Sequence, residues 1–401
     1  MNDLLVFNIG SLVTNDPKHG GLLGLVTDAA VAIIDGVVDW VGAEADIPTE
    51  YENLPRLDAG GAAVLPGFVD PHTHLVFAGD RSDEFARRLR GESYEEILAA
   101  GGGILSTVAA TRATSEDDLY DAAAERAWRM LANGTTTVEV KSGYGLDTAT
   151  EEKMLSVARR LDESLPIDIV PTFLGAHVVP AEYSEDRDAY VDLVCGEMLD
   201  ACAPLTRFCD VFSDDAAFTV AETRRILEAA KSRGLEVRVH ADQLGRVGAA
   251  HLAAELSAAS ADHLDHATDE DLAAMNAAGT SAVLLPAVSF SMRLPYPEGR
   301  RIWDSGVTVA LATDCNPGTA NVESMPFVAA LATLNMGLTP DEAIWAATRG
   351  GALSLRLEDR GHLLPGAVAD LVILDAPTHL HIPYRPDADL IAAVVKGGVI
   401  L

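Results

Sequence analysis

Long hydrophobic stretches are missing from this chain of 401 residues. No apolar run reaches the length of about 18 residues that a membrane-spanning helix needs, which argues against a helical membrane protein. The first residues also lack the charged segment and cleavage site of a secretory signal peptide. We therefore expect a protein of the cytoplasm that has no membrane partner.

Lysine is scarce, and almost all basic residues are arginine. The formal net charge is −32, which argues against nucleic-acid binding because that function needs a basic face. Self-repulsion at this charge is tolerable where salt screens it, since the Debye length falls to about 3 Å at 1 M. We hypothesise a salt-rich cytoplasm, as in halophiles.

Cysteine and glycine motifs are also absent. The four cysteines form no CxxC pair and match no zinc-finger spacing, so we expect reduced, buried thiols. No G-x-G-x-x-G fingerprint supports a doubly wound dinucleotide-binding fold. The glycines at 101–103 follow a helical segment rather than a strand, which makes a phosphate loop improbable there.

From residue 62 to about 350, apolar runs alternate with segments of helical period. Eight strands, each followed by a helix or a long loop, predict an α/β protein with a (β/α)8 TIM-like barrel. The predicted strands are Ala62–Val69, Thr135–Val140, Ile167–Phe173, Phe208–Phe212, Leu235–Val239, Ser260–His263, Ser281–Val288 and Val307–Ala312. The predicted helices include Glu84–Ala100, Ser115–Asn133, Thr148–Glu163, Thr219–Arg233, Asp269–Ala278 and Pro340–Arg349.

Both ends of the chain have β character. Short strands are predicted at Leu4–Ile9, Ala30–Ile34 and Val37–Val41, and β-rich stretches return at Gly361–Leu374 and Ala392–Leu401. We expect residues 1–61 and 355–401 to build one small β-sandwich domain beside a barrel of residues 62–354.

The first barrel strand ends in the sequence PGFVDPHTH. Residues i and i+2 of an extended segment point the same way, so His72 and His74 can present two imidazoles to one metal ion. Asp70 could hydrogen-bond one of these rings. Two unrelated loop histidines are the alternative.

Polar residues also follow other strands, and in barrels the chemistry lies at the carboxyl ends of the strands. His240 after the fifth strand and Asp314 after the eighth would complete a His3Asp metal site with room for water. Asp314 could accept a proton from that water, and His263 could serve as acid or base. Lys141 could instead be carboxylated and bridge two metals, but we favour a single metal and a supporting role for Lys141.

These motifs resemble the amidohydrolase superfamily, and the resemblance covers nearly the whole chain. KSGYG, HADQ and TDCNPG together with PGFVDPHTH are similar to the branch that opens an imidazolone ring in histidine degradation. The resemblance implies a metal-dependent hydrolase that converts 4-imidazolone-5-propanoate to N-formimidoyl-L-glutamate.

The resemblance also implies roles for single residues. The metal, zinc or iron, would be held by His72, His74, His240 and Asp314, and His263 would aid catalysis. The substrate contacts would be Arg81, Tyr144, His177, Gln243, Asn316, Gly318 and Thr319. Some relatives have Glu where this chain has Gln243, whose carboxamide has no useful basicity, so we expect Gln243 to orient the ring.

Several alternatives stay open at this point. Arg81 could form a surface ion pair with Asp80, Asp83 or Glu84. The role of Asn316 could be limited to shaping a turn. Tyr144 could pack in the core, although its flanking glycines favour an exposed loop. The protein could be a different amidohydrolase, such as a purine or pyrimidine deaminase, or a non-catalytic barrel. The expected partners are a small-molecule substrate and a second copy of the chain in a homodimer.

Overall fold

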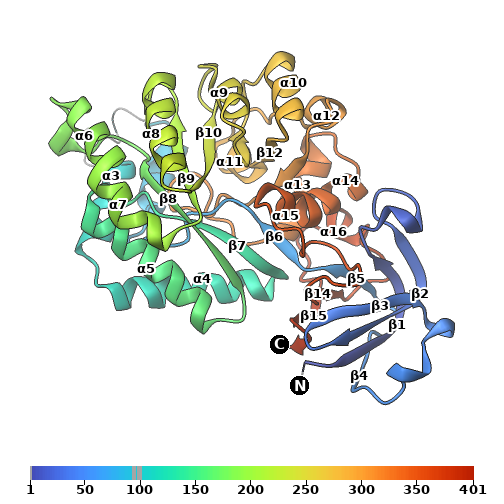
Figure 1. Cartoon of the computed structure of the whole chain (residues 1–401). Coiled ribbons are helices and arrows are strands. Elements are labelled where there is room, and N and C mark those ends of the chain that lie inside the picture. Colours follow the sequence, from blue (N-terminus) through green and yellow to red (C-terminus); the bar gives the residue numbers. More distant parts are fainter. Residues whose placement is uncertain (1, 93–95, 97–101) are drawn as a thin grey trace.

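The computed structural model describes residues 2–92, 96 and 102–401, and it contains two eight-stranded sheets (Figure 1). One sheet is the parallel barrel, and the other is a mixed sheet built from both ends of the chain. The blue amino-terminal strands and the red carboxyl-terminal strands lie side by side in Figure 1, with both termini at the same edge.

The barrel strands follow the chain in order around the sheet, and every neighbouring pair is parallel. Their bounds are β6 Phe68–Asp70, β7 Thr135–Lys141, β8 Asp168–Ala176, β9 Phe208–Ser213, β10 Glu236–Ala241, β11 Ser260–His263, β12 Ser281–Leu284 and β13 Val309–Leu311. Beyond β6 and β13, Thr73 bridges Cys315 in parallel. This bridge brings the two ends of the sheet together, and the predicted (β/α)8 barrel is confirmed.

Helices surround the barrel on its outer side (Figure 1). The α-helices are α1 Ser82–Leu89, α3 Ile104–Ala113, α4 Glu116–Ala132, α5 Thr148–Ser164, α6 Arg187–Leu193, α7 Leu199–Cys202, α8 Val220–Ser232, α9 Ala249–Glu255, α10 Asp269–Ala278, α11 Pro286–Met292, α12 Gly299–Asp304, α13 Met325–Asn335, α14 Pro340–Trp345, α15 Gly351–Ser354 and α16 His381–Tyr384. Short 3-10 turns occur at η1 Pro17–His19, η2 Glu44–Asp46, η3 Thr49–Tyr51, η4 Ala181–Tyr183 and η6 Ala203–Leu205, and π turns at η5 Val194–Met198 and η7 Ala346–Gly350.

The helix starts follow from the local sequence. Thr219 caps α8 by accepting the amide hydrogen of Glu222, whose carboxylate accepts the Thr219 amide in return. Ser115 caps α4 in the same position, by accepting the amide hydrogen of Asp118. Such caps satisfy amide groups that the first helical turn leaves free, so they fix where each helix begins after its strand.

The mixed sheet has the order β16-β15-β14-β5-β1-β2-β3, with β4 paired to β1. Its strands are β1 Leu4–Val13, β2 Leu25–Ile34, β3 Val37–Ala43, β4 Arg56–Asp58, β5 Ala63–Pro66, β14 Leu371–Leu374, β15 Ile391–Lys396 and β16 Val399–Ile400. Both chain ends therefore contribute to one sheet, as expected. The division into domains at residues 61 and 355 stays a prediction.

Three predicted elements differ from the structure. The strand Ala62–Val69 is two strands, because β5 belongs to the mixed sheet and only β6 enters the barrel. Gly67 lies between them, and a Cβ there would stand 2.2 Å from the hydroxyl of Thr136. The strand Ser281–Val288 ends at Leu284, since Pro286 begins α11.

The helix predicted at Glu84–Ala100 begins earlier, at Ser82, and α1 ends at Leu89. Most of the remaining predicted span, residues 93–95 and 97–101, lies outside the described residues.

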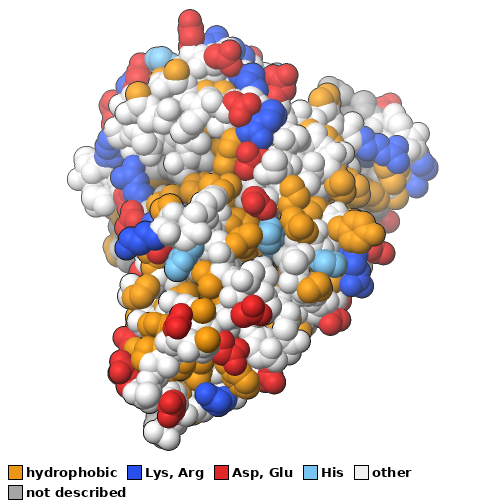
Figure 2. Space-filling view, turned by 90° about the vertical axis from the view of Figure 1, so that its right-hand side faces the viewer, with side chains coloured by type: hydrophobic (Ala, Val, Ile, Leu, Met, Phe, Trp, Pro, Cys, Tyr) orange, Lys and Arg blue, Asp and Glu red, His pale blue; other side chains and the backbone are white. Residues whose placement is uncertain are grey.

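The surface carries acidic side chains scattered over the face seen in Figure 2, while hydrophobic side chains gather in its middle. Within the described part of the chain, none of the helices combines the length and the apolar composition that crossing a membrane requires.

Candidate metal centre and substrate pocket

Three imidazoles meet at the carboxyl end of the barrel. His72 and His74 follow β6 and His240 lies on β10, and each offers a ring nitrogen within 4.8 Å of the others. All three side chains are buried. Asp314 comes from the segment after β13, with Oδ1 3.5 Å from His72 Nε2 and 3.4 Å from His74 Nε2. The sequence analysis selected these four residues, and the structure brings them together.

The donor atoms fit a metal ion. His72 Nε2, His240 Nε2 and Asp314 Oδ1 are buried and have no hydrogen-bond partner among the described residues. Buried polar atoms are rarely left without a partner. Two tetrahedral ligands about 2.0–2.1 Å from zinc stand roughly 3.3 Å apart, close to the two carboxylate–imidazole distances. A cation at this point would satisfy all of these atoms.

Burial keeps the histidines in the form that binds metals. Burial, together with the Lys141 ammonium, holds the pKa of His72 well below its usual value. Burial and the neighbouring His240 ring do the same to the pKa of His74. Burial raises the pKa of Asp314, against the opposing pull of His263 and His240. Neutral imidazoles are the ligands that zinc and iron require.

A carboxylate stands behind two of the imidazoles. Asp262 Oδ2 lies 2.7 Å from His72 Nδ1, and Asp210 Oδ2 lies 3.0 Å from His240 Nδ1. Such contacts fix the tautomer and direct the other ring nitrogen outward. Asp70, which the sequence offered as a possible partner of a ring, does not have that role. Asp70 instead accepts the hydroxyl and amide hydrogens of Thr313.

Lys141 lies inside the barrel between two buried carboxylates. Its Nζ lies 2.8 Å from both Glu139 Oε1 and Asp210 Oδ2. Burial acts to lower the pKa of Lys141, but Asp210 and Glu139 outweigh it and raise that pKa above its usual value. These contacts fit the supporting role predicted for Lys141, and the single-metal site stays a prediction.

His263 lies at the end of β11 with its ring centroid 5.5 Å from that of His72 and 5.3 Å from that of His240. Its backbone is in the left-handed region, with φ at 77°, which is unusual for a residue other than glycine. Burial lowers the pKa of His263 to about 3, even though Asp314 acts to raise it. The ring is therefore neutral beside the candidate metal ligands.

Two more aromatic residues lie against the centre. The His177 ring stacks on His74 at 5.1 Å, and the Tyr144 ring lies 5.7 Å from His74. Tyr144 is buried, with 3% of its surface exposed, so the expectation of an exposed loop was wrong. The glycines serve a different purpose, because Glu151 accepts the amide hydrogens of Gly143 and Gly145.

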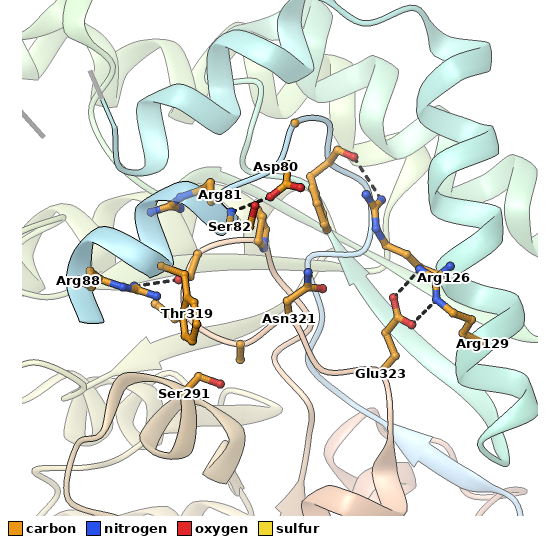
Figure 3. A pocket seen from close by; sticks show the side chains of 16 residues that line it. Asp80, Arg81, Ser82, Arg88, Arg126, Arg129, Ser291, Thr319, Asn321 and Glu323 are labelled. Carbon is orange, nitrogen blue, oxygen red and sulfur yellow. Dashed lines mark hydrogen bonds and ion pairs between the residues drawn. The ribbon is translucent and has the colours of Figure 1, made fainter. Parts of the chain in front are cut away.

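A cavity of about 670 Å³ opens between Arg81 and the loop at Gly318 and Thr319 (Figure 3), and the four candidate metal ligands are not among the residues that line it. Arg81, Gly318 and Thr319 line it, together with Arg88 and Arg126. Arg81 donates from Nε and Nη2 to the carboxylate of Glu84, at 3.0 and 2.5 Å. The ion pair weighed from the sequence is thus present, yet it lies at the wall of a pocket.

Asn316 shapes the loop on which Gly318 and Thr319 lie. Its Oδ1 accepts the amide hydrogens of both residues at 2.8 Å, and its Nδ2 donates to the carbonyl of Asp314 at 2.7 Å. The turn considered from the sequence is therefore real. The same contacts place this loop directly after the proposed metal ligand.

Gln243 follows β10 in the segment after His240. It is half-buried and makes no hydrogen bond to another described residue. Asp242, which precedes it, accepts the amide hydrogens of Val247, Gly248 and Ala250 and so ties this segment to the start of α9. Gln243 is held in place by its neighbour while its own amide stays available.

Sequence reasoning missed the charged residues below the imidazoles. Asp210, Asp262, Glu139 and Arg238 are all fully buried inside the barrel. The signal was visible, because each charge interrupts a predicted apolar strand of the barrel. Charged side chains are almost never fully buried unless they are paired.

Comparison with known proteins agrees with this geometry. The profile described as "Amidohydrolase family" matches residues 63–401. An imidazolonepropionase of Mycolicibacterium smegmatis is 52% identical over 402 residues, covering 100% of this chain and 98% of that protein. An imidazolonepropionase of Salinispora arenicola is 52% identical over 401 residues, covering 100% of this chain and 99% of that protein.

Solved structures show the same fold at greater distance. A triazine hydrolase variant superposes with a TM-score of 0.76 at 18% identity, covering 100% of this chain and 95% of that one. A match of this kind supports only the fold, whereas the sequence relatives span the whole chain. The chain belongs to the amidohydrolase family, among the imidazolonepropionases, which are hydrolases of histidine degradation.

Proposed function

We propose that this protein hydrolyses the cyclic amide of 4-imidazolone-5-propanoate to N-formimidoyl-L-glutamate. The observation that carries the proposal is the convergence of the side chains of His72, His74, His240 and Asp314 at one end of the barrel. Water adds to the ring carbonyl carbon, the ring bond from that carbon to nitrogen breaks, and a new carboxylate forms.

We propose that one zinc or iron ion is held by these four residues. The donor set of three imidazoles and one carboxylate suits either metal and leaves a position for water. When bound, such an ion supplies a Lewis acid that polarises a carbonyl and makes hydroxide available near neutral pH. The carboxylates of Asp262 and Asp210 would hold the rings of His72 and His240 in the orientation that this site needs.

Asp314 and His263 would move the protons. Asp314 is the carboxylate at the centre, so it accepts a proton from the attacking water and returns it to the leaving ring nitrogen. His263 is neutral, buried and close to both His72 and His240, so it can accept or relay a proton on the same side. No other titratable group is then required for the proton balance.

Arg81 would hold the propanoate of the substrate. A guanidinium binds a carboxylate with two parallel hydrogen bonds, and Arg81 lies at the pocket wall next to Gly318. Tyr144 and His177 would pack against the imidazolone ring, since both lie against His74. Gln243, with its free amide, and the loop of Asn316, Gly318 and Thr319 would bind the polar groups of the ring.

The test follows the loss of imidazolone absorbance and identifies the product by mass spectrometry. We expect turnover by the wild type, none by His240→Ala, and a raised KM with a smaller change in kcat for Arg81→Ala. Arg87→Ala is the matched control, because Arg87 lies on α1, the helix that Arg81 directly precedes, pairs with Glu92 at 2.7 Å and does not line the pocket. Ammonia release from an amino-substituted ring, without imidazolone turnover, would instead identify a deaminase.

The cellular setting is also a proposal. We propose a homodimer in the cytoplasm, since two-fold dimers are the commonest soluble oligomers. Light scattering of the eluted protein would give twice the mass of one chain, and a monomer mass would exclude the dimer.

A further inference from the structure

Five charged side chains form a cluster inside the barrel, directly beneath the histidines. They are Glu139 and Lys141 on β7, Asp210 on β9, Arg238 on β10 and Asp262 on β11. None of them is exposed to solvent. A buried charge is costly unless it is paired, so this cluster calls for a physical reason.

Each cation in the cluster pairs with the carboxylates. Lys141 Nζ lies 2.8 Å from Asp210 Oδ2, 2.8 Å from Glu139 Oε1 and 3.7 Å from Asp262 Oδ2. Arg238 Nη2 lies 3.2 Å from the same Asp262 oxygen. Three carboxylates and two cations are thereby buried together, and Lys141 contacts all three carboxylates.

The cluster reaches two imidazoles through its carboxylates. The Asp210 oxygen that Lys141 contacts lies 3.0 Å from His240 Nδ1. The Asp262 oxygen that Arg238 contacts lies 2.7 Å from His72 Nδ1. One carboxylate therefore links each cation to an imidazole: Asp210 links Lys141 to His240, and Asp262 links Arg238 to His72.

The cluster also holds the backbone on both sides of His72. Arg238 Nη2 donates to the carbonyl of Pro71 at 2.7 Å. Glu139 Oε2 accepts the amide hydrogen of Thr73 at 3.2 Å. The ring and the chain at His72 are thus fixed by the same buried charges.

We propose that Lys141 and Arg238 are positioning residues that keep Asp210 and Asp262 in place as the acceptors behind His240 and His72. This inference rests on the metal site proposed above. The cations touch neither the substrate nor the metal position, and they act through the two carboxylates. Without Lys141, the Asp210 oxygen that faces the His240 ring loses its charged partner, and only the amide hydrogens of Val211 and His240, which bind the other oxygen, still hold the carboxylate.

The chain offers a matched control for a buried lysine. Lys396 Nζ lies 2.7 Å from Asp168 Oδ2 and 2.9 Å from Asp370 Oδ2, and its side chain is 11% exposed. It therefore bridges two aspartates, as Lys141 does, but it belongs to β15 of the mixed sheet. Loss of Lys396 removes a comparable ion pair without touching any of the histidines.

The experiment compares wild type, Lys141→Met, Asp210→Asn, the double variant and Lys396→Met, each loaded with Zn²⁺. Zinc transfer to a chromophoric chelator gives the rate of loss, and the Co²⁺-substituted forms give a visible spectrum that reports ligand geometry. Near-ultraviolet circular dichroism gives the folded fraction. Changes next to metal-binding histidines cost about 10–100-fold in metal affinity, so we expect at least tenfold faster zinc loss from folded Lys141→Met.

The double variant should lose zinc no faster than Asp210→Asn, because both changes act through one carboxylate. Lys396→Met should lower stability and leave zinc loss and the cobalt spectrum unchanged. Wild-type zinc loss and cobalt spectrum from folded Lys141→Met would overturn the inference, as would additive effects in the double variant. If Lys141→Met does not fold, Arg238→Met and Asp210→Asn test the same link. Failure of the wild type to bind Zn²⁺ or Co²⁺ would instead refute the metal site.

Discussion

Glu151 holds the loop that carries Tyr144, and replacing it by glutamine gives a sharp prediction. The buried carboxylate accepts three amide hydrogens, from Gly143 at 2.9 Å and from Gly145 and Leu146 at 2.8 Å. Glutamine keeps the shape but turns one acceptor into a donor. The Gly143 amide then faces another donor and keeps only its longer contact with Oε1, at 3.2 Å, while the bonds from Gly145 and Leu146 lose their charged acceptor.

The magnitude follows from the contacts. A buried amide without an acceptor costs about 1–3 kcal/mol, and bonds to a charged acceptor are worth roughly 1 kcal/mol more than neutral ones. Burial raises the pKa of Glu151 despite the Ser142 hydroxyl and these amides, so a neutral side chain recovers part of the loss. We expect Glu151→Gln to lower the free energy of unfolding by about 1–3 kcal/mol.

The same change should reach the substrate pocket. If about 0.7–1.4 kcal/mol of the loss appears as weaker substrate binding through Tyr144, KM rises roughly 3–10-fold. Urea denaturation and the imidazolone assay measure the two effects. Glu152→Gln is the matched control, since Glu152 is the next residue of α5 and is exposed. Equal unfolding energies and equal KM values for the two variants would refute the role given to Glu151.

Three further predictions concern other parts of the molecule. Burial acts to raise the pKa of Glu222, but Arg187 and the Thr219 cap lower it to about 2, from 4.5. Its ionised form therefore stabilises the fold fully above pH 4.5. Glu222→Gln should lower the free energy of unfolding by about 1 kcal/mol at pH 7. In urea titrations at decreasing pH, the difference between the two proteins should shrink as the pH falls toward 2. A difference that does not depend on pH would contradict it. Gln243→Ala should raise KM. It should change the free energy of unfolding by less than about 0.5 kcal/mol, because the Gln243 amide has no partner among the described residues. A large loss of stability would contradict this. The net charge of −32 predicts a higher urea midpoint in molar KCl, and equal midpoints at low and high salt would rule out a salt-adapted surface.

Strand order and the metal-binding motifs were predictable because they are local. His72 and His74 are two residues apart on one extended segment, and the alternation of apolar runs and helices specified the barrel. Where one apolar run contributes strands to two different sheets, the sequence does not show where the first strand ends and the second begins. The run from Ala62 to Val69 looked like one strand, yet Gly67 lets the chain leave the mixed sheet and enter the barrel.

Side-chain partners were harder to predict because they depend on distant segments. Asp70 lies next to the ligands in sequence, but the acceptor behind His72 is Asp262, far along the chain. Likewise, the partners of Lys141 on β9 and β11 become neighbours only when the barrel closes. The charged residues inside apolar strands were the available clue, and the pairing itself required the structure.

Metal content combined with turnover tests the central claim most directly. The purified protein, and the protein after chelator treatment and Zn²⁺ addition, should be analysed by elemental mass spectrometry and assayed with 4-imidazolone-5-propanoate. The account predicts one ion per chain, loss of turnover with the metal, recovery on Zn²⁺ addition, and neither metal nor turnover in His240→Ala. Full turnover by metal-free protein would contradict it.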